Sequence, residues 1–136
     1  MANPALRNLV ADRAGQRCEY CHLPQAGYEA RFHLDHIIAS QHMDADDPDN
    51  LALSCPRCNR KKGPNLAGVD PQTAQVMVLF HPRRDVWHDH FQWAGPMLVA
   101  RTATARATIA ALDLNGDDRI RLRLALIAEG VIEAIS

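Results

Sequence analysis

The feature that most limits how this chain can fold is a pair of Cys-x2-Cys motifs, Cys18/Cys21 and Cys55/Cys58. A turn of this kind holds two sulfur atoms about one tetrahedral edge apart, so two such turns can complete a four-thiolate zinc shell. Zinc bound in this way would stabilise the fold directly, because its ligands come together only in the folded chain. The alternative is two redox pairs or disulfides. The span between the motifs, residues 22–54, is long for a ribbon-type zinc site and must hold more than a turn.

The size and composition of the chain suit a single domain, residues 1–136. With 47% apolar and 23% charged residues, it is close to an average globular protein, which excludes collagen-like and disordered chains. Only 5% of the residues are aromatic, so a core short of large side chains would gain from a metal staple. Neither a membrane span nor a signal peptide is apparent. We therefore expect a cytoplasmic protein with no membrane partner, in a reducing compartment where four cysteines favour zinc.

The net charge of −1 hides a local separation of charge. Residues 31–50 carry one basic and five acidic side chains, whereas residues 51–64 carry no acidic side chain and four basic ones, namely Arg57, Arg60, Lys61 and Lys62. A run of bases is usually a solvated surface. A chain with this net charge has no overall basic field, so any contact with nucleic acid must come from such a local patch.

Hydrophobic periodicity and turn residues predict the elements of secondary structure. In the first half we expect a short helix from Pro4 to Gly15, strands at 31–38 and 51–54, a polar loop at 39–50, and a helix near 59–62 that ends at Gly63-Pro64. In the second half we expect strands at 75–80, 91–93 and 97–101, the last two paired, and helices at 104–112 and 117–129, with Asn115 as N-cap and Gly130 as stop.

Residues whose side chains suit catalysis or metal binding lie between the cysteine motifs and directly after them. The segment reads Asp35-His36-Ile37-Ile38, then Asp49-Asn50-Leu51, then Cys55-Pro-Arg-Cys58-Asn59-Arg60-Lys61-Lys62-Gly63. In order and spacing, residues 18–63 resemble the HNH endonuclease family, and in particular the branch in which a four-cysteine zinc site frames the ββα-metal (His-Me finger) motif. The resemblance implies an α+β fold with residues 18–63 as a zinc-stapled nuclease core. Residues 64–136 would be a family-specific extension with strands and C-terminal helices.

The resemblance also assigns roles to four side chains. Asp35 and Asn59 would be ligands of a catalytic divalent cation, His36 would be the general base, and Asn50 would tie the loop backbone and hold His36 in position. This chain has Asn59 where other members carry histidine. The residue types suit these roles, because a neutral imidazole can accept a proton near pH 7 and because Mg²⁺ prefers oxygen ligands. Mg²⁺ or Mn²⁺ would be the catalytic cofactor, and the saturated zinc would be structural.

The function implied by the resemblance is a metal-dependent DNA endonuclease that leaves 5′-phosphate and 3′-hydroxyl ends. The resemblance also favours phosphate contacts by the bases around the helix that would lie against the DNA backbone, namely Arg57, Arg60, Lys61 and Lys62. A protein partner or a homodimer could supply sequence specificity.

The alternative is a catalytically inactive, zinc-stapled module that binds DNA or acts as a scaffold. A plain zinc-ribbon interaction protein would leave the combination of Asp35, His36, Asn50 and Asn59 unexplained.

Overall fold

A computed structural model describes residues 4–38 and 47–132 of the chain. The chain divides into two compact units, which are described separately here. Unit 1 is formed by Met1–Leu66 and His81–Arg84, and unit 2 is formed by Ala67–Phe80 and Asp85–Ser136. That the whole chain is a single domain stays a prediction. His42, Asp44 and Asp46 of the expected polar loop lie outside the described residues.

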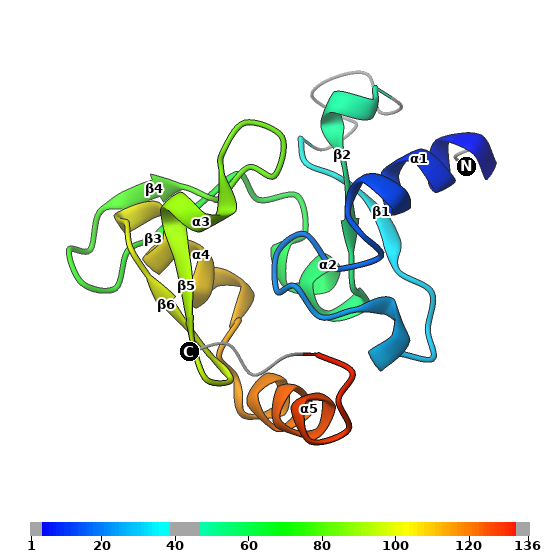
Figure 1. The fold of residues 1–136 in the computed structure, drawn as a ribbon. Coiled ribbons are helices and arrows are strands. Elements are labelled where there is room, and N and C mark those ends of the chain that lie inside the picture. The colour runs from blue at the N-terminus through cyan, green and yellow to red at the C-terminus, as the bar shows by residue number, and fades with distance from the viewer. Residues whose placement is uncertain (1–3, 39–46, 133–136) are drawn as a thin grey trace. The chain divides into compact units, whose positions relative to one another are not determined.

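Unit 1 is built on two antiparallel strands followed directly by a helix (Figure 1). Its described elements are α1 (Pro4–Arg13), a 3-10 helix (Gln25–Gly27), β1 (His33–His36), a 3-10 helix (Pro48–Asn50), β2 (Leu51–Ser54) and α2 (Pro56–Lys62). The strand expected at 51–54 is confirmed, while that expected at 31–38 is shorter. The register pairs Asp35 with Ala52 and His36 with Leu51.

Helix α2 begins before the expected position near residue 59 because its first residue is a proline. Pro56 has no backbone N–H to satisfy and suits the first helical position. The Cys55 side chain caps the helix by accepting from the Cys58 N–H at 3.4 Å. Gly63 ends the helix as expected, with a φ of 53° that favours glycine. The early start places Cys58 and Asn59 inside a regular helix.

Helix α1 is attached to the strand pair by two arginines. The Arg13 guanidinium donates to the Leu51 carbonyl at 2.8 Å, and the Arg7 guanidinium donates to the Phe32 carbonyl. Val10 is the buried residue of α1, and Leu23, in the segment that follows α1, is also buried. The expected end of α1 at Gly15 agrees with its observed end at Arg13, and Gly15 has a left-handed φ of 65°.

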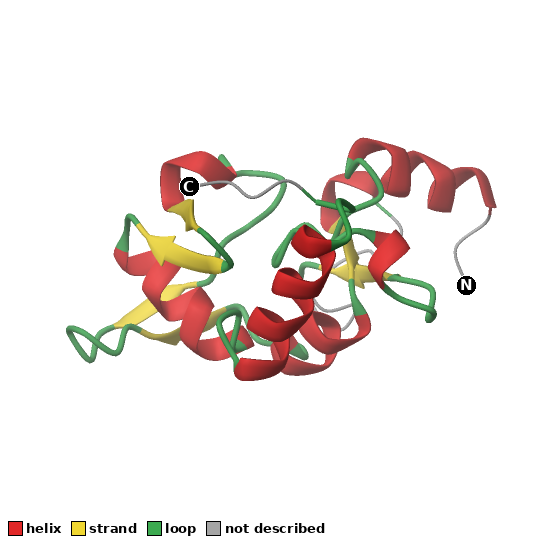
Figure 2. Ribbon diagram, turned by 60° about the horizontal axis from the view of Figure 1, so that its bottom comes forward, coloured by secondary structure: helices red, strands yellow, loops and turns green. Residues whose placement is uncertain are grey.

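Unit 2 contains short strand pairs and helices (Figure 2). Its described elements are β3 (Ala67–Val69), β4 (Val76–Val78), α3 (Trp87–His90), β5 (Phe91–Ala94), β6 (Met97–Ala100), α4 (Ala103–Leu112) and α5 (Asp117–Ala128). The predicted pairing of the strands near 91–93 and 97–101 is confirmed. Strand β3 and helix α3 were not anticipated. The mixture of helices and small antiparallel sheets confirms the α+β class.

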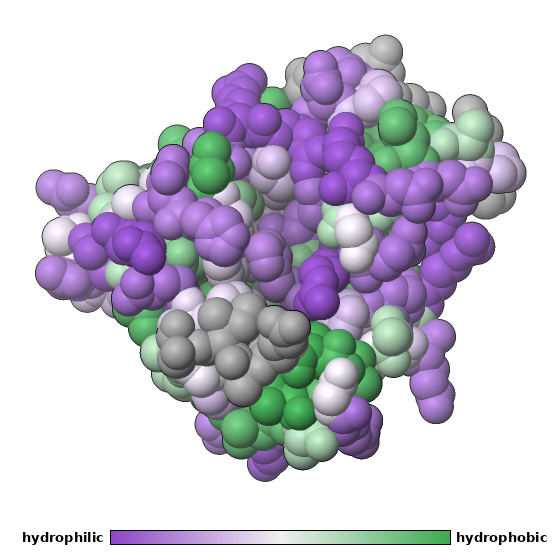
Figure 3. Space-filling view, in the orientation of Figure 1, coloured by the Kyte–Doolittle hydropathy of each residue, from purple (hydrophilic) through white to green (hydrophobic). Residues whose placement is uncertain are grey.

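The last helix differs from expectation in its cap and in its buried side. Asn115 does not cap α5, because its side chain is already bonded to the Leu98 backbone, donating at 2.8 Å and accepting at 2.9 Å. Helix α5 buries Arg119, Arg123 and Leu126, and apolar residues gather on the surface over α5 in the lower part of Figure 3. None of the described helices combines the length and the apolar character that crossing a membrane requires.

Candidate metal centre and catalytic cavity

The four cysteines converge on one point in unit 1. Cys18 and Cys21 lie in a tight turn after α1, in which the Cys18 N–H donates to the Leu23 carbonyl and the His22 N–H donates to the Cys18 carbonyl, both at 2.9 Å. Cys55 and Cys58 lie at the start of α2. Local structure therefore fixes each pair, and the strand pair brings the two pairs together.

The cysteine group has the geometry that a zinc ion requires. All four side chains are fully buried, and their Sγ atoms lie within 4.8 Å of one another. The Cys21 and Cys55 sulfurs are 3.8 Å apart. Bonds of about 2.3 Å in a tetrahedral shell would separate the sulfurs by about 3.8 Å, so the donor set fits zinc. All four thiols are free, which is contrary to the disulfide alternative.

Protonation of these thiols opposes metal binding, and the pKa is shifted in different directions in the four cysteines. Hydrogen bonds from the Cys18 thiol lower the pKa of Cys55 and of Cys21. Burial raises the pKa of Cys18, and the neighbouring Cys18 thiol raises that of Cys58. Zinc binding requires thiolates and so must release the remaining protons.

Unit 1 also contains a cavity of about 300 Å³, whose wall is formed by β1, by α2 and by Gly63 and Pro64 after the end of α2. Three of the four side chains predicted to be catalytic, Asp35, His36 and Asn59, contribute to its wall, together with His33. Asn50 does not line it. Asp35 and His36 come from the end of β1, and Asn59 comes from the middle of α2. The cavity therefore joins a carboxylate, an imidazole and a carboxamide.

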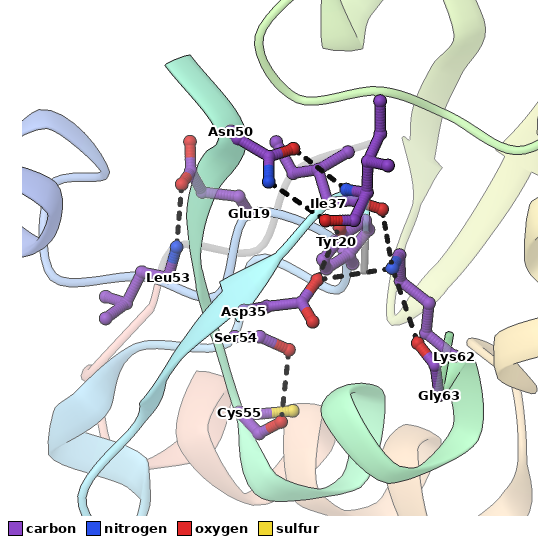
Figure 4. A network of polar contacts seen from close by, with 11 residues as sticks. Glu19, Tyr20, Asp35, Ile37, Asn50, Leu53, Ser54, Cys55, Lys62 and Gly63 are labelled. Atoms are coloured by element: carbon purple, nitrogen blue, oxygen red, sulfur yellow. Dashed lines mark hydrogen bonds and ion pairs between the residues drawn. The ribbon is translucent and has the colours of Figure 1, made fainter. Parts of the chain in front are cut away.

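Asp35 is the most constrained side chain of the cavity (Figure 4). It is 6% exposed, and its Oδ2 accepts a hydrogen bond from the Tyr20 hydroxyl at 3.0 Å and lies 3.5 Å from Nζ of Lys62. Burial raises the pKa of Asp35, while Lys62 and Tyr20 act in the opposite direction. Tyr20 itself is almost fully buried, and burial and the Asp35 charge raise its pKa. The Tyr20 hydroxyl therefore stays a donor to Asp35.

Asn50 ties the chain at the end of β1, next to His36. Its side-chain oxygen accepts from the Ile38 N–H at 2.9 Å, its amide donates to the Ile38 carbonyl at 2.9 Å, and its backbone carbonyl accepts from the Ile37 N–H at 2.9 Å. In Figure 4 the side chain of Asn50 lies at the upper end of the strand pair, near Ile37. Lys62 adds a hydrogen bond from Nζ to the Ile37 carbonyl at 3.1 Å. Ile37 and Ile38, which follow His36, are thus held by Asn50 and Lys62. That Asn50 positions His36 for catalysis stays a prediction.

Asn50→Ala is expected to lower the free energy of unfolding by about 1–3 kcal/mol, because it leaves the N–H and carbonyl of Ile38 without their partner. Urea unfolding of the zinc-loaded chain measures this, with the exposed Asn65→Ala as control. If Asn50→Ala and Asn65→Ala are equally stable, Asn50 has no such role.

The four predicted phosphate-contacting bases do not share one environment. Arg60 and Lys61 are exposed on α2, whereas Arg57 and Lys62 are buried. Lys62 was expected at the DNA surface, but its Nζ is directed inward to Asp35 and to the Ile37 carbonyl. In this arrangement only Arg60 and Lys61 present their charges to a surface ligand.

Sequence reasoning missed the two residues inside the first cysteine motif. Besides Tyr20, Glu19 accepts from the Leu53 N–H at 2.8 Å and forms an ion pair with Arg83. Burial and the nearby charge of Arg13 lower the pKa of Arg83 to about 10. Each motif residue thus contacts one strand of the pair, Tyr20 through Asp35 and Glu19 through Leu53. The sequence signal that could have indicated this role is the position of a polar and an acidic residue between two metal-binding cysteines.

Comparison with known proteins agrees with this architecture. Residues 18–65 match the family model described as HNH endonuclease. The matched segment contains all four cysteines and the whole cavity wall, and it confirms the family resemblance of this part of the chain. Comparison with curated proteins and with solved structures gave no match. Residues 18–65 are thus similar to a family whose members are generally endonucleases.

Proposed function

We propose that the protein is a metal-dependent DNA endonuclease that hydrolyses phosphodiester bonds at the cavity of unit 1. The observation that carries the proposal is that Asp35, His36 and Asn59 line one cavity within a segment that matches the HNH endonuclease family. The residues fit a catalytic Mg²⁺ or Mn²⁺, since an aspartate and an asparagine offer the oxygen atoms that these hard cations prefer. The cysteine group is a separate site with the softer ligands that suit zinc.

In this mechanism, His36 accepts a proton from the water that attacks the phosphorus atom. The bond from phosphorus to the 3′ oxygen then breaks, and this oxygen takes up a proton from solvent water, which leaves a 5′-phosphate and a 3′-hydroxyl. Asp35 and Asn59 would hold the cation, which when bound supplies positive charge to the phosphate and the departing oxygen. Asn50 acts through the backbone, because its contacts with Ile37 and Ile38 fix the strand end that carries His36.

DNA binding in this proposal depends on the exposed bases of α2. Arg60 and Lys61 follow Asn59 in the helix but do not line the cavity, so in this proposal they bind phosphates of the DNA backbone away from the bond that is cut. Contacts to phosphate carry no sequence information, so this surface supports cleavage with little intrinsic preference.

One observation favours a second candidate, a zinc-stapled DNA-binding or scaffold module without turnover. The Nζ atom of Lys62 already lies 3.5 Å from Oδ2 of Asp35. Its positive charge neutralises part of the negative charge of Asp35 that would attract a divalent cation. The four-cysteine group is compatible with either candidate. The difference between them is whether the cavity accepts a divalent cation and cuts.

Nicking of supercoiled plasmid by the zinc-loaded chain tests the proposal. With Mg²⁺ or Mn²⁺ we expect nicked circles that DNA ligase reseals, since ligase requires a 5′-phosphate and a 3′-hydroxyl. Asn59→Ala is expected to lower the rate by about 10–100-fold through loss of a metal ligand, whereas the exposed Asn65→Ala should not. A parent protein that shifts plasmid mobility without nicking would instead support the binding module.

A further inference from the structure

We propose that Tyr20 and Lys62 are positioning residues that leave Asp35 only one oxygen for a cation, so that the cavity selects Mg²⁺ and Mn²⁺ over Ca²⁺. The inference rests on the proposed function, because it concerns the same cavity. It assigns a task to Lys62, which was expected at the DNA surface, and to Tyr20, which lies between two cysteines.

The two oxygens of Asp35 have different surroundings. Oδ2 accepts from the Tyr20 hydroxyl at 3.0 Å and faces the Lys62 ammonium at 3.5 Å. Oδ1 has no hydrogen-bond partner among residues 4–38 and 47–132, and Asp35 lines the cavity. Figure 4 shows both contacts converging on the same oxygen. The carboxylate is therefore held from one side and available from the other.

Both partners of Oδ2 are themselves fixed. The side chains of Tyr20 and Lys62 are 1% and 2% exposed. Tyr20 is held in the turn between Cys18 and Cys21, and Lys62 lies at the end of the helix that contains Cys58, with further donation from Nζ to the Ile37 carbonyl at 3.1 Å. Rotation of Asp35 to offer both oxygens would break two buried polar contacts. Each cysteine motif is thus connected to the Asp35 carboxylate, the first through Tyr20 and the second through Lys62.

A carboxylate held in this way discriminates between cations by their coordination. Mg²⁺ takes an octahedral shell at about 2.0–2.1 Å, uses single carboxylate oxygens and keeps several waters. Ca²⁺ takes about six to eight oxygens at about 2.3–2.6 Å and often binds a carboxylate through both oxygens. Oδ1 of Asp35 and the amide oxygen of Asn59 meet the first requirement. Binding of Ca²⁺ through both oxygens of Asp35 would need Oδ2, where the Lys62 charge repels a cation.

The test is metal binding by the zinc-loaded chain, with Mn²⁺ followed by electron paramagnetic resonance and Ca²⁺ by calorimetry. The measured quantity is the dissociation constant for Ca²⁺ divided by that for Mn²⁺. In the parent this ratio should be well above one. Lys62→Met should lower it by about tenfold, and Tyr20→Phe by a smaller factor in the same direction, as expected for residues that orient a ligand. The matched controls Lys61→Met and Tyr28→Phe should leave it unchanged, because neither residue contacts Asp35.

The outcomes separate this inference from the proposed function. If Lys62→Met and Tyr20→Phe weaken both cations equally or change neither, Tyr20 and Lys62 do not select the metal, while a loss of Mn²⁺ binding in Asp35→Asn still supports the nuclease. If Asp35→Asn binds Mn²⁺ as the parent does, both proposals are wrong. Zinc content is measured for every variant, and if Lys62→Met loses zinc, the ratio for the isosteric Tyr20→Phe decides.

Discussion

Cys55→Ser is expected to abolish zinc binding and to unfold unit 1. Cys55 supplies one of four converging thiols, caps helix α2 and is fully buried. The apparent binding free energy of a structural zinc is about 10–16 kcal/mol, which is at least comparable to the usual net stability of about 5–15 kcal/mol for a whole domain. We expect elemental analysis to fall from about one zinc per chain to none. Amide exchange should lose the protection of strands β1 and β2.

The control for this prediction is Ser54→Ala, a change at the neighbouring buried position that leaves all four thiols in place. Ser54 donates to the Cys55 carbonyl at 3.2 Å, so this variant loses one weak contact and should keep its zinc. A Cys55→Ser protein that retains protected strands without metal would show that the cysteine group is not required for folding.

His36→Ala is expected to lower the single-turnover rate of DNA nicking by about 10²–10⁴, the usual contribution of a general base. The fold and the zinc content should not change, because the flanking Asp35 and Ile37 are held by Lys62 and not by His36. Added imidazole should restore part of the rate, since a free base can enter the cavity that the missing side chain leaves.

The matched control is His33→Ala, which removes an exposed imidazole of the same strand and the same cavity wall. Its effect should be much smaller than that of His36→Ala. If the two variants lose activity equally, or if His36→Ala cuts at the parent rate, the proton acceptor is a different group.

The parts of the fold that the sequence predicted are those set by local rules. The strand at residues 51–54 is bounded by a polar loop and by Cys55, and the second helix ends where Gly63 allows a left-handed turn. The convergence of the cysteines could be anticipated because zinc requires four ligands. That Asp35, His36 and Asn59 line one cavity could be anticipated too. The zinc ligands lie near both ends of the segment from Asp35 to Asn59, so zinc binding brings those ends together.

The parts that the sequence could not predict depend on contacts between distant residues. Lys62 looks like one more base in a solvated run, and only the packing of α2 on β1 shows that it is buried against Asp35. Asn115 is a residue type that helix N-caps favour, yet both hydrogen-bonding groups of its side chain are bonded to the backbone of Leu98. In both cases a long-range partner overrides a sound local preference.

The ion pair between Glu19 and Arg83 has a consequence for dissecting the chain. The family match stops at residue 65, but residues 81–84 return to unit 1, and Arg83 holds the glutamate that accepts from Leu53 in strand β2. A fragment cut after residue 66 would therefore lose the counter-charge of a half-buried acid. A fragment that retains the Glu19–Arg83 ion pair has to extend past residues 81–84, well beyond the end of the family match.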